Sequence, residues 1–134
     1  MKTVSLVGRS NGYEHAFNAE GTIWCVSSAF KLLHPDKVDL IFNLHHPDVF
    51  EDWLPDEGHR VCTAFPGPYK RQYPVDHMIR KYGPVFGSSI SWMIALAIEE
   101  GFQKINIFGC DMASKEEYIY QRDTFFICAE ERKR

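Results

Sequence analysis

The chain has 134 residues, of which 45% are hydrophobic and 25% charged, and these values exclude a disordered, collagen-like or coiled-coil protein. A chain of this length can bury roughly two-thirds of its unfolded surface, so we expect a single domain, without disulfides, over residues 1–134. The net charge of −3 gives no general attraction for nucleic acid, so no nucleic-acid partner is expected.

The first half of the chain alternates short β-rich runs with polar loops. Strands are expected at residues 3–7, 22–26, 38–44 and 60–64. Residues 8–12 follow the first strand as a loop with a glycine at each end and short polar residues between. Ser27-Ser28 is expected to cap a short helix that reaches about Leu33 and is ended by Pro35. A brief helix is expected at residues 49–53.

The second half contains the clearest helix. Residues 65–86 are rich in proline and glycine, which predicts a long loop with one helical turn at residues 75–81. Residues 88–101 begin with serines, are apolar almost all round and end at a glycine, so we expect a nearly buried helix there. A strand is expected at residues 104–108, and an amphipathic helix from residue 116 to about residue 132.

This alternation of strands and helices predicts an α/β fold, a Rossmann-like three-layer fold with a mostly parallel sheet. In such sheets, ligands bind outside the carboxyl ends of the strands, where the strand order switches. The loops expected at that edge are residues 8–12, 26–28, 43–48 and 109–114, with 87–89 if the helix that they open points there. All are rich in small or polar residues, so we expect a binding site at this edge.

The cysteines and the first residues predict a cytoplasmic protein that does not enter a membrane. None of the four cysteines forms a Cys-x-x-Cys pair, and free cysteines often pack as small hydrophobes in a reducing compartment. A strand-like run begins directly after Met1-Lys2, so no signal peptide is expected. The longest apolar run, residues 90–98, is about half the length of a membrane span.

Three segments are candidate anion sites, each with a structural alternative. Residues 8–12 can hold a phosphate through backbone N–H groups and Arg9, although the loop matches no known phosphate-binding pattern and a plain turn is the alternative. Ser88 and Ser89 can bind an anion or a ribose at a helix start, or only cap that helix. Asp111 can bind a ribose, a base or Mg²⁺, or form a structural turn.

The remaining polar clusters are less specific. His45 and His46 are adjacent and diverge, with no partner at metal-ligand spacing, so no metal site is assigned to them. Either histidine can serve as a general base or contact a substrate. Lys70-Arg71 can clamp phosphates or form a solvated basic loop. Aromatic residues of the last predicted helix pack on the sheet, and any to spare can form a contact between subunits.

Several short motifs follow one another in a recognisable order. Residues 4–12 form a strand that runs into a Gly-Arg-Ser-Asn-Gly loop, and Phe42-Asn43 ends a later strand. Ser88-Ser89 opens a helix that ends near Gly101-Phe102, and Gly109-Cys110-Asp111 follows the next strand. This order resembles the small bacterial α-2,3-sialyltransferases that modify lipooligosaccharide and the related proteins similar to 6-hydroxymethylpterin diphosphokinase.

The chain also departs from that family. The loop at residues 8–12 lacks the family's proline, and Val26 replaces an asparagine that ends the family's second strand. The family's proposed general base is a histidine in a further lid region, whereas no histidine follows His77 here, so sialyl transfer by that machinery is not expected. A pyrophosphokinase would need Mg²⁺, for which Asp111 and Asp48 are the candidate ligands. Similar short proteins occur in phage genomes, where binding without turnover is a reasonable role.

The predicted function is binding of a nucleotide or nucleotide sugar, with group transfer from a nucleotide donor as a further step. The candidate nucleotide-binding residues, from the loops and from the resemblance, are Gly8, Arg9, Ser10, Asn11, Asn43, Ser88, Ser89, Gly109 and Asp111. The candidate catalytic bases are His45 and His46. Two alternatives are a non-catalytic protein that sequesters a nucleotide signal as a homo-oligomer, and a protein-interaction domain in which the loops bind nothing.

Overall fold

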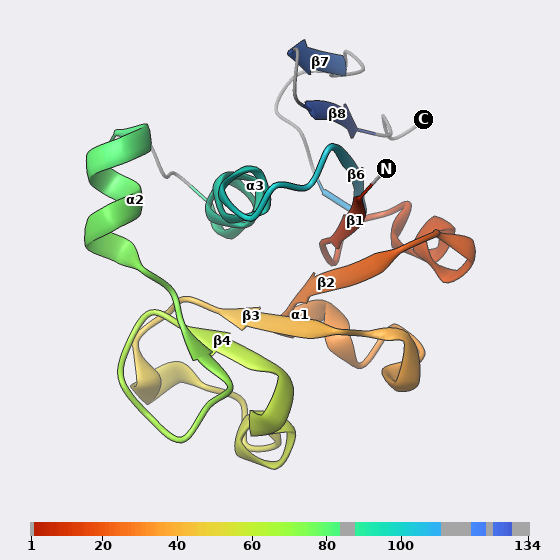
Figure 1. The fold of residues 1–134 in the computed structure, drawn as a ribbon. Helices are drawn as coiled ribbons and strands as arrows, with labels where there is room; N and C mark the ends of the chain where they lie inside the picture. Colours follow the sequence, from red (N-terminus) through yellow and green to blue (C-terminus); the bar gives the residue numbers. More distant parts are fainter. Residues whose placement is uncertain (1, 84–87, 111–118, 123–124, 130–134) are drawn as a thin grey trace.

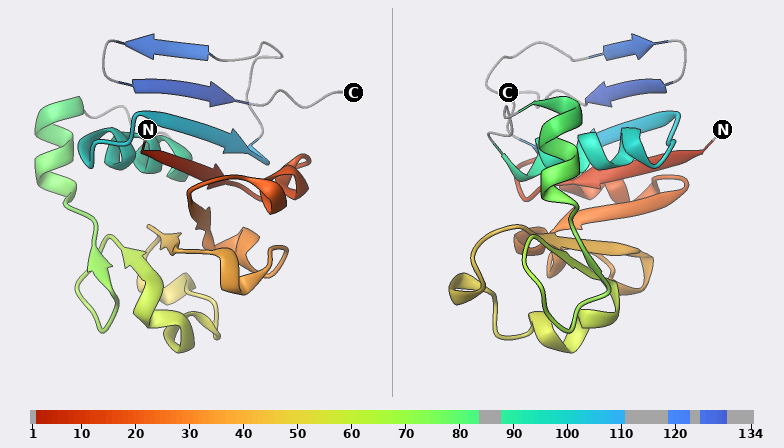
Figure 2. Two further views of the ribbon diagram at one scale, coloured as in Figure 1. Left: turned by 45° about the vertical axis from the view of Figure 1, so that its right-hand side comes forward. Right: turned by 60° about the vertical axis from the view of Figure 1, so that its left-hand side comes forward.

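The computed structural model describes residues 2–83, 88–110, 119–122 and 125–129, and their strands form an eight-stranded sheet. The strand order is β5-β4-β3-β2-β1-β6-β8-β7 (Figure 1 and Figure 2). The strands are β1 (Thr3–Val7), β2 (Thr22–Val26), β3 (Leu40–Asn43), β4 (Val61–Thr63), β5 (Arg71–Gln72), β6 (Lys104–Phe108), β7 (Ile119–Arg122) and β8 (Phe125–Ala129). Neighbouring strands are parallel except β7 and β8, so the predicted mostly parallel sheet is confirmed.

Helices cover both faces of the sheet. The α-helices are α1 (Ser27–Phe30), α2 (Val75–Tyr82) and α3 (Ser89–Glu99). Short 3-10 helices span Tyr13–Asn18, Pro35–Lys37, Pro47–Val49 and Leu54–Arg60. One buried cluster joins α2 and α3 to the sheet, and a second joins α1 and several 3-10 helices to its opposite face (Figure 1). The layers are those of the α/β three-layer fold predicted from the sequence.

The central strand β1 is buried on both faces. Val4 and Leu6 belong to the cluster under α3, whereas Val7 belongs to the cluster on the α1 side. Parallel sheets bury both faces, which is why their strands are near-continuous apolar runs in the sequence. In the neighbouring strand, Trp24 packs on the α3 side with its ring centroid 5.2 Å from that of Phe42. Aromatic packing therefore joins β2 and β3 directly beneath the edge where a site is expected.

The topology gathers the polar loops at one edge of the sheet. The chain runs outward from β1 through β2, β3 and β4 to β5, and returns over α2 and α3 to β6 on the other side of β1. Because only residues 100–103 separate α3 from β6, the C-terminus of α3 lies near the start of β6. The N-terminus of α3 therefore points to the edge where β1, β2, β3 and β6 end. Ser88 and Ser89 therefore lie at this edge, as expected if the helix points there, whereas Gly87 lies outside the described residues.

The amphipathic helix predicted from residue 116 to about residue 132 is wrong. Ile119–Arg122 and Phe125–Ala129 are the antiparallel strands β7 and β8, and β8 pairs with the free edge of β6. The other residues of that predicted helix lie outside the described residues. The strand segments carry β-branched and aromatic residues, which favour strands. Pairing with the open edge of β6 satisfies backbone groups that a helix in this position would leave exposed.

Two shorter predicted helices also differ from the structure. The helix expected to start after a serine cap has Val26 as its N-cap, includes Ser27 in its first turn and ends at Phe30, before Leu33. The helix expected at residues 49–53 is absent from the described chain, which has 3-10 helices at Pro47–Val49 and Leu54–Arg60 instead. Both 3-10 helices carry a proline in their first turn, a position that proline favours.

Candidate functional site

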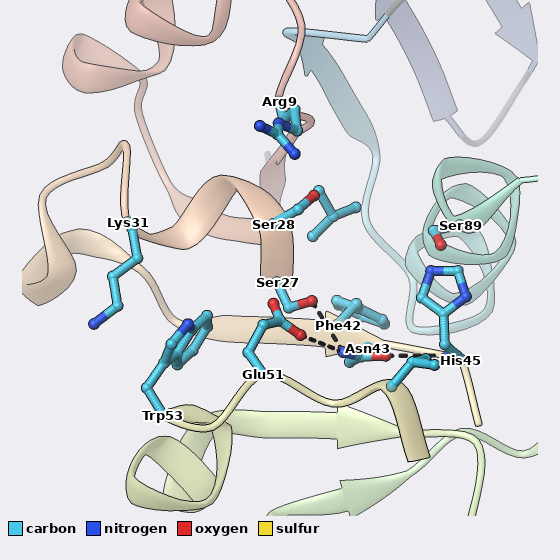
Figure 3. A pocket seen from close by; sticks show the side chains of 12 residues that line it. Arg9, Ser27, Ser28, Lys31, Phe42, Asn43, His45, Glu51, Trp53 and Ser89 are labelled. Atoms are coloured by element: carbon cyan, nitrogen blue, oxygen red, sulfur yellow. Dashed lines mark hydrogen bonds between the residues drawn. The ribbon is translucent and has the colours of Figure 1, made fainter. Parts of the chain in front are cut away.

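A cavity of about 430 Å³ opens at the carboxyl edge of the sheet, above the ends of β2 and β3 (Figure 3). Its volume lies within the usual range for small-molecule sites, and its location is the one where α/β sheets bind ligands. The lining residues are Arg9, Val26, Ser27, Ser28, Lys31, Phe42, Asn43, His45, Val49, Glu51, Trp53 and Ser89. They come from the loop after β1, the β2–α1 junction, β3 and the loop that follows it, and the start of α3.

Asn43 is the hydrogen-bonding centre of the cavity floor. It is the last residue of β3 and is 2% exposed. Its Nδ2 donates to Ser27 Oγ at 3.1 Å and to Glu51 Oε1 at 2.8 Å, and its Oδ1 accepts from the backbone N–H of His45 at 3.1 Å (Figure 3). Both amide protons are thus used within the protein. Asn43 therefore positions its neighbours and has no free donor for a ligand.

Hydroxyl groups enter the cavity from two elements. Ser27 is buried in the first turn of α1, and its Oγ accepts from Asn43, which leaves the hydroxyl hydrogen for another acceptor. Ser28 is exposed at the adjacent position, and Ser89 is half-buried at the first residue of α3. The N-terminus of α3 adds free backbone N–H groups and a positive dipole end at the same edge.

Two cations line the cavity from different elements. Arg9 belongs to the loop after β1, and Lys31 follows the last residue of α1; both are exposed (Figure 3). Lys31 Nζ lies 5.0 Å from the ring centroid of Trp53, whose ring stacks on that of Phe30 at 5.0 Å. This cation–π contact and the stacked rings hold the ammonium group beside the cavity. Two cations in the lining make the cavity suited to an anion.

Glu51 supplies the negative charge. The loop after β3 carries its side chain over the ends of β3 and β2, where Oε1 accepts from Asn43. Its Oε2 is buried and has no hydrogen-bond partner among the described residues. The cavity lining therefore includes two cations and a partly unsatisfied carboxylate.

Gly8 and Gly109 hold two loops in contact beside the cavity and do not line it. The N–H of Gly8 donates to Phe108 O at 2.8 Å, and the N–H of Ser10 donates to Gly109 O at 2.7 Å. A Cβ atom on Gly8 would lie 2.6 Å from Gly109 O, and one on Gly109 would lie 2.5 Å from Gly8 O. The loops after β1 and β6 therefore pack backbone against backbone at the switch in strand order. The cavity lies on the β2 and β3 side of this contact.

Four of the residues proposed from the sequence line the cavity together: Arg9, Asn43, His45 and Ser89. Those that do not line it are Gly8, Ser10, Asn11, His46, Ser88 and Gly109, and Asp111 lies outside the described residues. Ser27 and Ser28 also line the cavity; the sequence placed residues 26–28 among the loops at this edge but did not list them as candidate binding residues. Lys31, Glu51 and Trp53 line it too, and no sequence pattern pointed to them.

The two candidate bases have different environments. His45 lines the cavity and is exposed. His46 Nδ1 instead accepts from the backbone N–H of Asp48 at 3.2 Å and caps the 3-10 helix Pro47–Val49. Its ring meets that of Phe65 edge-on, with centroids 5.5 Å apart. His45 is therefore the histidine in position to meet a ligand in this cavity.

The basic pair predicted as a phosphate clamp does not line the cavity. Arg71, in the edge strand β5, forms an ion pair with Glu100, and the contact raises the pKa of the guanidinium further. A second hollow of about 770 Å³ lies beside β4, β5 and the start of α2. Its lining residues include Tyr73, His77 and Trp92 but no lysine or arginine. The cavity above β2 and β3 is the better candidate for an anionic ligand.

Neither a metal cluster among the described residues nor a similarity to a known protein indicates the function. The described residues contain no group of three or more His, Cys, Asp or Glu side chains placed to hold a metal ion. Of the two candidate Mg²⁺ ligands, Asp48 is exposed and does not line the cavity, and Asp111 lies outside the described residues. No helix in the described part of the chain is long and apolar enough to cross a membrane.

No protein-family model, curated protein or solved structure matches the chain.

Proposed function

We propose that this protein binds a nucleotide or a nucleotide sugar in the cavity above β2 and β3. The observation that carries the proposal is the pair of cations, Arg9 and Lys31, that reach one cavity from different elements. That cavity lies outside the carboxyl ends of parallel strands, where α/β sheets bind nucleotides. A free phosphate, a nucleotide and a nucleotide sugar share this anionic group, and the volume of about 430 Å³ favours the larger ligands.

The phosphate is assigned to the two cations that line the cavity. Arg9 presents a planar guanidinium that can bind phosphate through two parallel hydrogen bonds, and Lys31 adds a compact positive charge. Ser28, which lies beside Arg9 in Figure 3, and Ser89 at the start of α3 each offer a hydroxyl hydrogen to an anion in the cavity. The start of α3 supports this assignment, because free N–H groups and the helix dipole favour an anion there.

The sugar and the base are assigned to the other lining residues. Ser27 and Glu51 offer polar groups, and Phe42 and Trp53 offer apolar surface. Aromatic and apolar walls with a few placed polar groups are typical of small-molecule sites. The proposal is one of binding; if group transfer follows, His45 is the lining residue that can act as its general base.

The test is a thermal-shift and calorimetric screen against nucleoside mono-, di- and triphosphates and nucleotide sugars. A ligand present at 100 times its Kd should stabilise the protein by about 2.7 kcal/mol. Arg9→Ala and Lys31→Ala should weaken binding, whereas Lys104→Ala should not, because Lys104 is exposed at the opposite edge of the sheet. No shift with any nucleotide on well-folded protein would contradict the proposal and favour the protein-interaction alternative.

A further inference from the structure

Glu51 carries a buried carboxylate oxygen that nothing in the described chain satisfies. Oε1 accepts from Asn43 Nδ2 at 2.8 Å, whereas Oε2 has no hydrogen-bond partner. A buried charged acceptor without a donor costs more free energy than a neutral one, so such atoms require an explanation. Ser5 Oγ is the other unpartnered buried side-chain atom of the described residues, but Ser5 lies in the middle of β1 and does not line the cavity.

No described group next to Glu51 donates a hydrogen bond to Oε2, so a donor has to come from a molecule in the cavity. Both amide protons of Asn43 are already used, one by Ser27 and one by Glu51 itself. Neither Arg9 nor Lys31 forms an ion pair with Glu51, although all three line the same cavity. The terminal torsion of a glutamate is soft, so Oε2 can turn toward a bound molecule while Oε1 keeps its bond to Asn43. A ligand is therefore well placed to satisfy this oxygen.

We propose that Glu51 selects ligands that bring a hydrogen-bond donor into the cavity, namely an amino group of the base or a hydroxyl of the sugar. This inference rests on the proposed nucleotide-binding function and states what the ligand carries beside its phosphate. A hydrogen bond to a carboxylate is roughly twice as strong as a neutral one, so the donor contributes strongly to affinity. The same charge repels phosphate.

The charged residues that line the cavity also orient the ligand. Phosphate is attracted to Arg9 and Lys31 and is disfavoured next to Glu51. A donor group is satisfied only at Glu51. A nucleotide that carries both groups therefore binds in one orientation, with its phosphate toward the cations and its sugar or base toward the carboxylate.

The experiment uses calorimetry on the wild type, Glu51→Gln and the matched control Asp52→Asn. Gln keeps an oxygen for Asn43 but presents an amide N–H₂, a donor, in place of Oε2. Asp52 is exposed, is adjacent in sequence and does not line the cavity, so its variant removes one negative charge without touching the ligand. The probes are AMP, GMP, CMP, UMP and their 2′,3′-dideoxy counterparts.

The expected result is a roughly 10- to 100-fold loss of affinity in Glu51→Gln for nucleotides that bring the donor, with Asp52→Asn close to the wild type. If the donor is an amino group of the base, UMP binds the wild type weakly and is insensitive to the substitution. If the donor is a sugar hydroxyl, the dideoxy nucleotides bind the wild type weakly, and Glu51→Gln does not change their affinity. Equal binding of every probe to the wild type and to Glu51→Gln would overturn the inference.

Two further outcomes separate this inference from the proposed function. Binding of nucleotides by the wild type without any preference for donor-bearing ones would overturn the inference and leave the proposed function intact; this comparison needs no variant, so it holds even if Glu51→Gln folds poorly. Failure of the wild type to bind any nucleotide would overturn the proposed function, and this inference with it.

Discussion

Gly8 and Gly109 meet backbone to backbone where β1 and β6 end, so closely that neither position has space for a Cβ atom. Gly109 also has a φ of +66°, a conformation that L side chains rarely adopt. Each glycine thus lets a loop pass close to its neighbour at the switch in strand order. The contact lies at the switch in strand order, and the cavity lies beside it at the same carboxyl edge of the sheet, over β2 and β3.

Gly109→Ala is expected to destabilise the protein by more than about 2 kcal/mol. The new Cβ would clash with Gly8 O and Tyr13 Cβ, and alanine would also have to adopt an unfavourable positive φ. Gly101→Ala is the matched control. Gly101 has a φ of +82° but nothing within 4 Å of the added atom, so only the conformational cost of roughly 1 kcal/mol applies. Urea unfolding measures both, and equal losses would show that the loop contact is unimportant.

Asn43→Ala is expected to lower the free energy of unfolding by about 1–3 kcal/mol and to weaken nucleotide binding. The substitution removes the donor to Ser27 and Glu51 and leaves buried acceptors unsatisfied. Asn43→Asp keeps the shape but places a second carboxylate beside Glu51, so its stability should recover at mildly acidic pH, where that repulsion is relieved. Denaturant titrations at neutral and acidic pH test both variants; a pH-independent Asn43→Asp would contradict this account.

Arg9→Ala and Lys31→Ala should each weaken binding of a nucleotide by roughly 5- to 100-fold, the range for one charge-assisted hydrogen bond in a partly exposed site. The double variant should show little remaining dependence of affinity on salt, because both cations that line the cavity are then removed. Calorimetry at low and high salt measures the effect. An unchanged salt dependence would place the phosphate elsewhere.

Glu99 links α3 to α2 and should make stability depend on pH under acidic conditions. Its carboxylate contacts His77 and accepts from Lys81 Nζ at 2.6 Å and Tyr82 OH at 3.1 Å. Lys81 first and then His77 lower the pKa of Glu99 to about 2, from an ordinary value of 4.5. A lowered pKa means that the stabilisation is complete above pH 4.5 and is lost as the pH falls toward 2.

The measurement for that prediction is the free energy of unfolding of the wild type and Glu99→Gln across this acidic range. The difference between the two should shrink as the pH falls, because protonation removes the same charge that the substitution removes. Glu20→Gln, at an exposed position, is the control and should follow the wild type at every pH. A constant difference between the wild type and Glu99→Gln would contradict the role given to this carboxylate.

The buried Cys25 and Cys62 and the half-buried Cys110 should resist alkylation in the folded protein. Burial raises the pKa of the Cys62 thiol to about 12 and that of Cys110 to about 11, and it raises the pKa of Cys25 as well. Few thiolates are therefore present near pH 8. In a Cys128→Ser background, iodoacetamide should modify these positions slowly until urea unfolds the chain. Rapid labelling of Cys25 or Cys62 in native protein would show that the core opens locally.

Strands β1 to β4 and β6, and the edge of the sheet where the cavity lies, were predictable from the sequence, because both depend on local patterns. A strand buried on both faces is a mainly apolar run, as β1 is apart from Thr3 and Ser5, and the polar residues at the end of such a run mark the edge of the sheet. Asn43 ends β3 and Arg9 lies two residues after β1, and both line the cavity. The polar loops after successive parallel strands meet at one edge in any fold of this class, so their meeting required no knowledge of side-chain contacts.

Only the tertiary structure decided which of those residues share the cavity and which hold the loops together. Glu51 and Trp53 arrive through a loop between two 3-10 helices, whose path depends on packing against α1 and on the bond to Asn43. The roles of Gly8 and Gly109 depend on contact between segments about a hundred residues apart. The C-terminal segment also depends on a distant contact, because pairing with the open edge of β6 stabilises strands there despite the helical periodicity of its sequence. Local propensity is weak, and contacts distant in sequence override it.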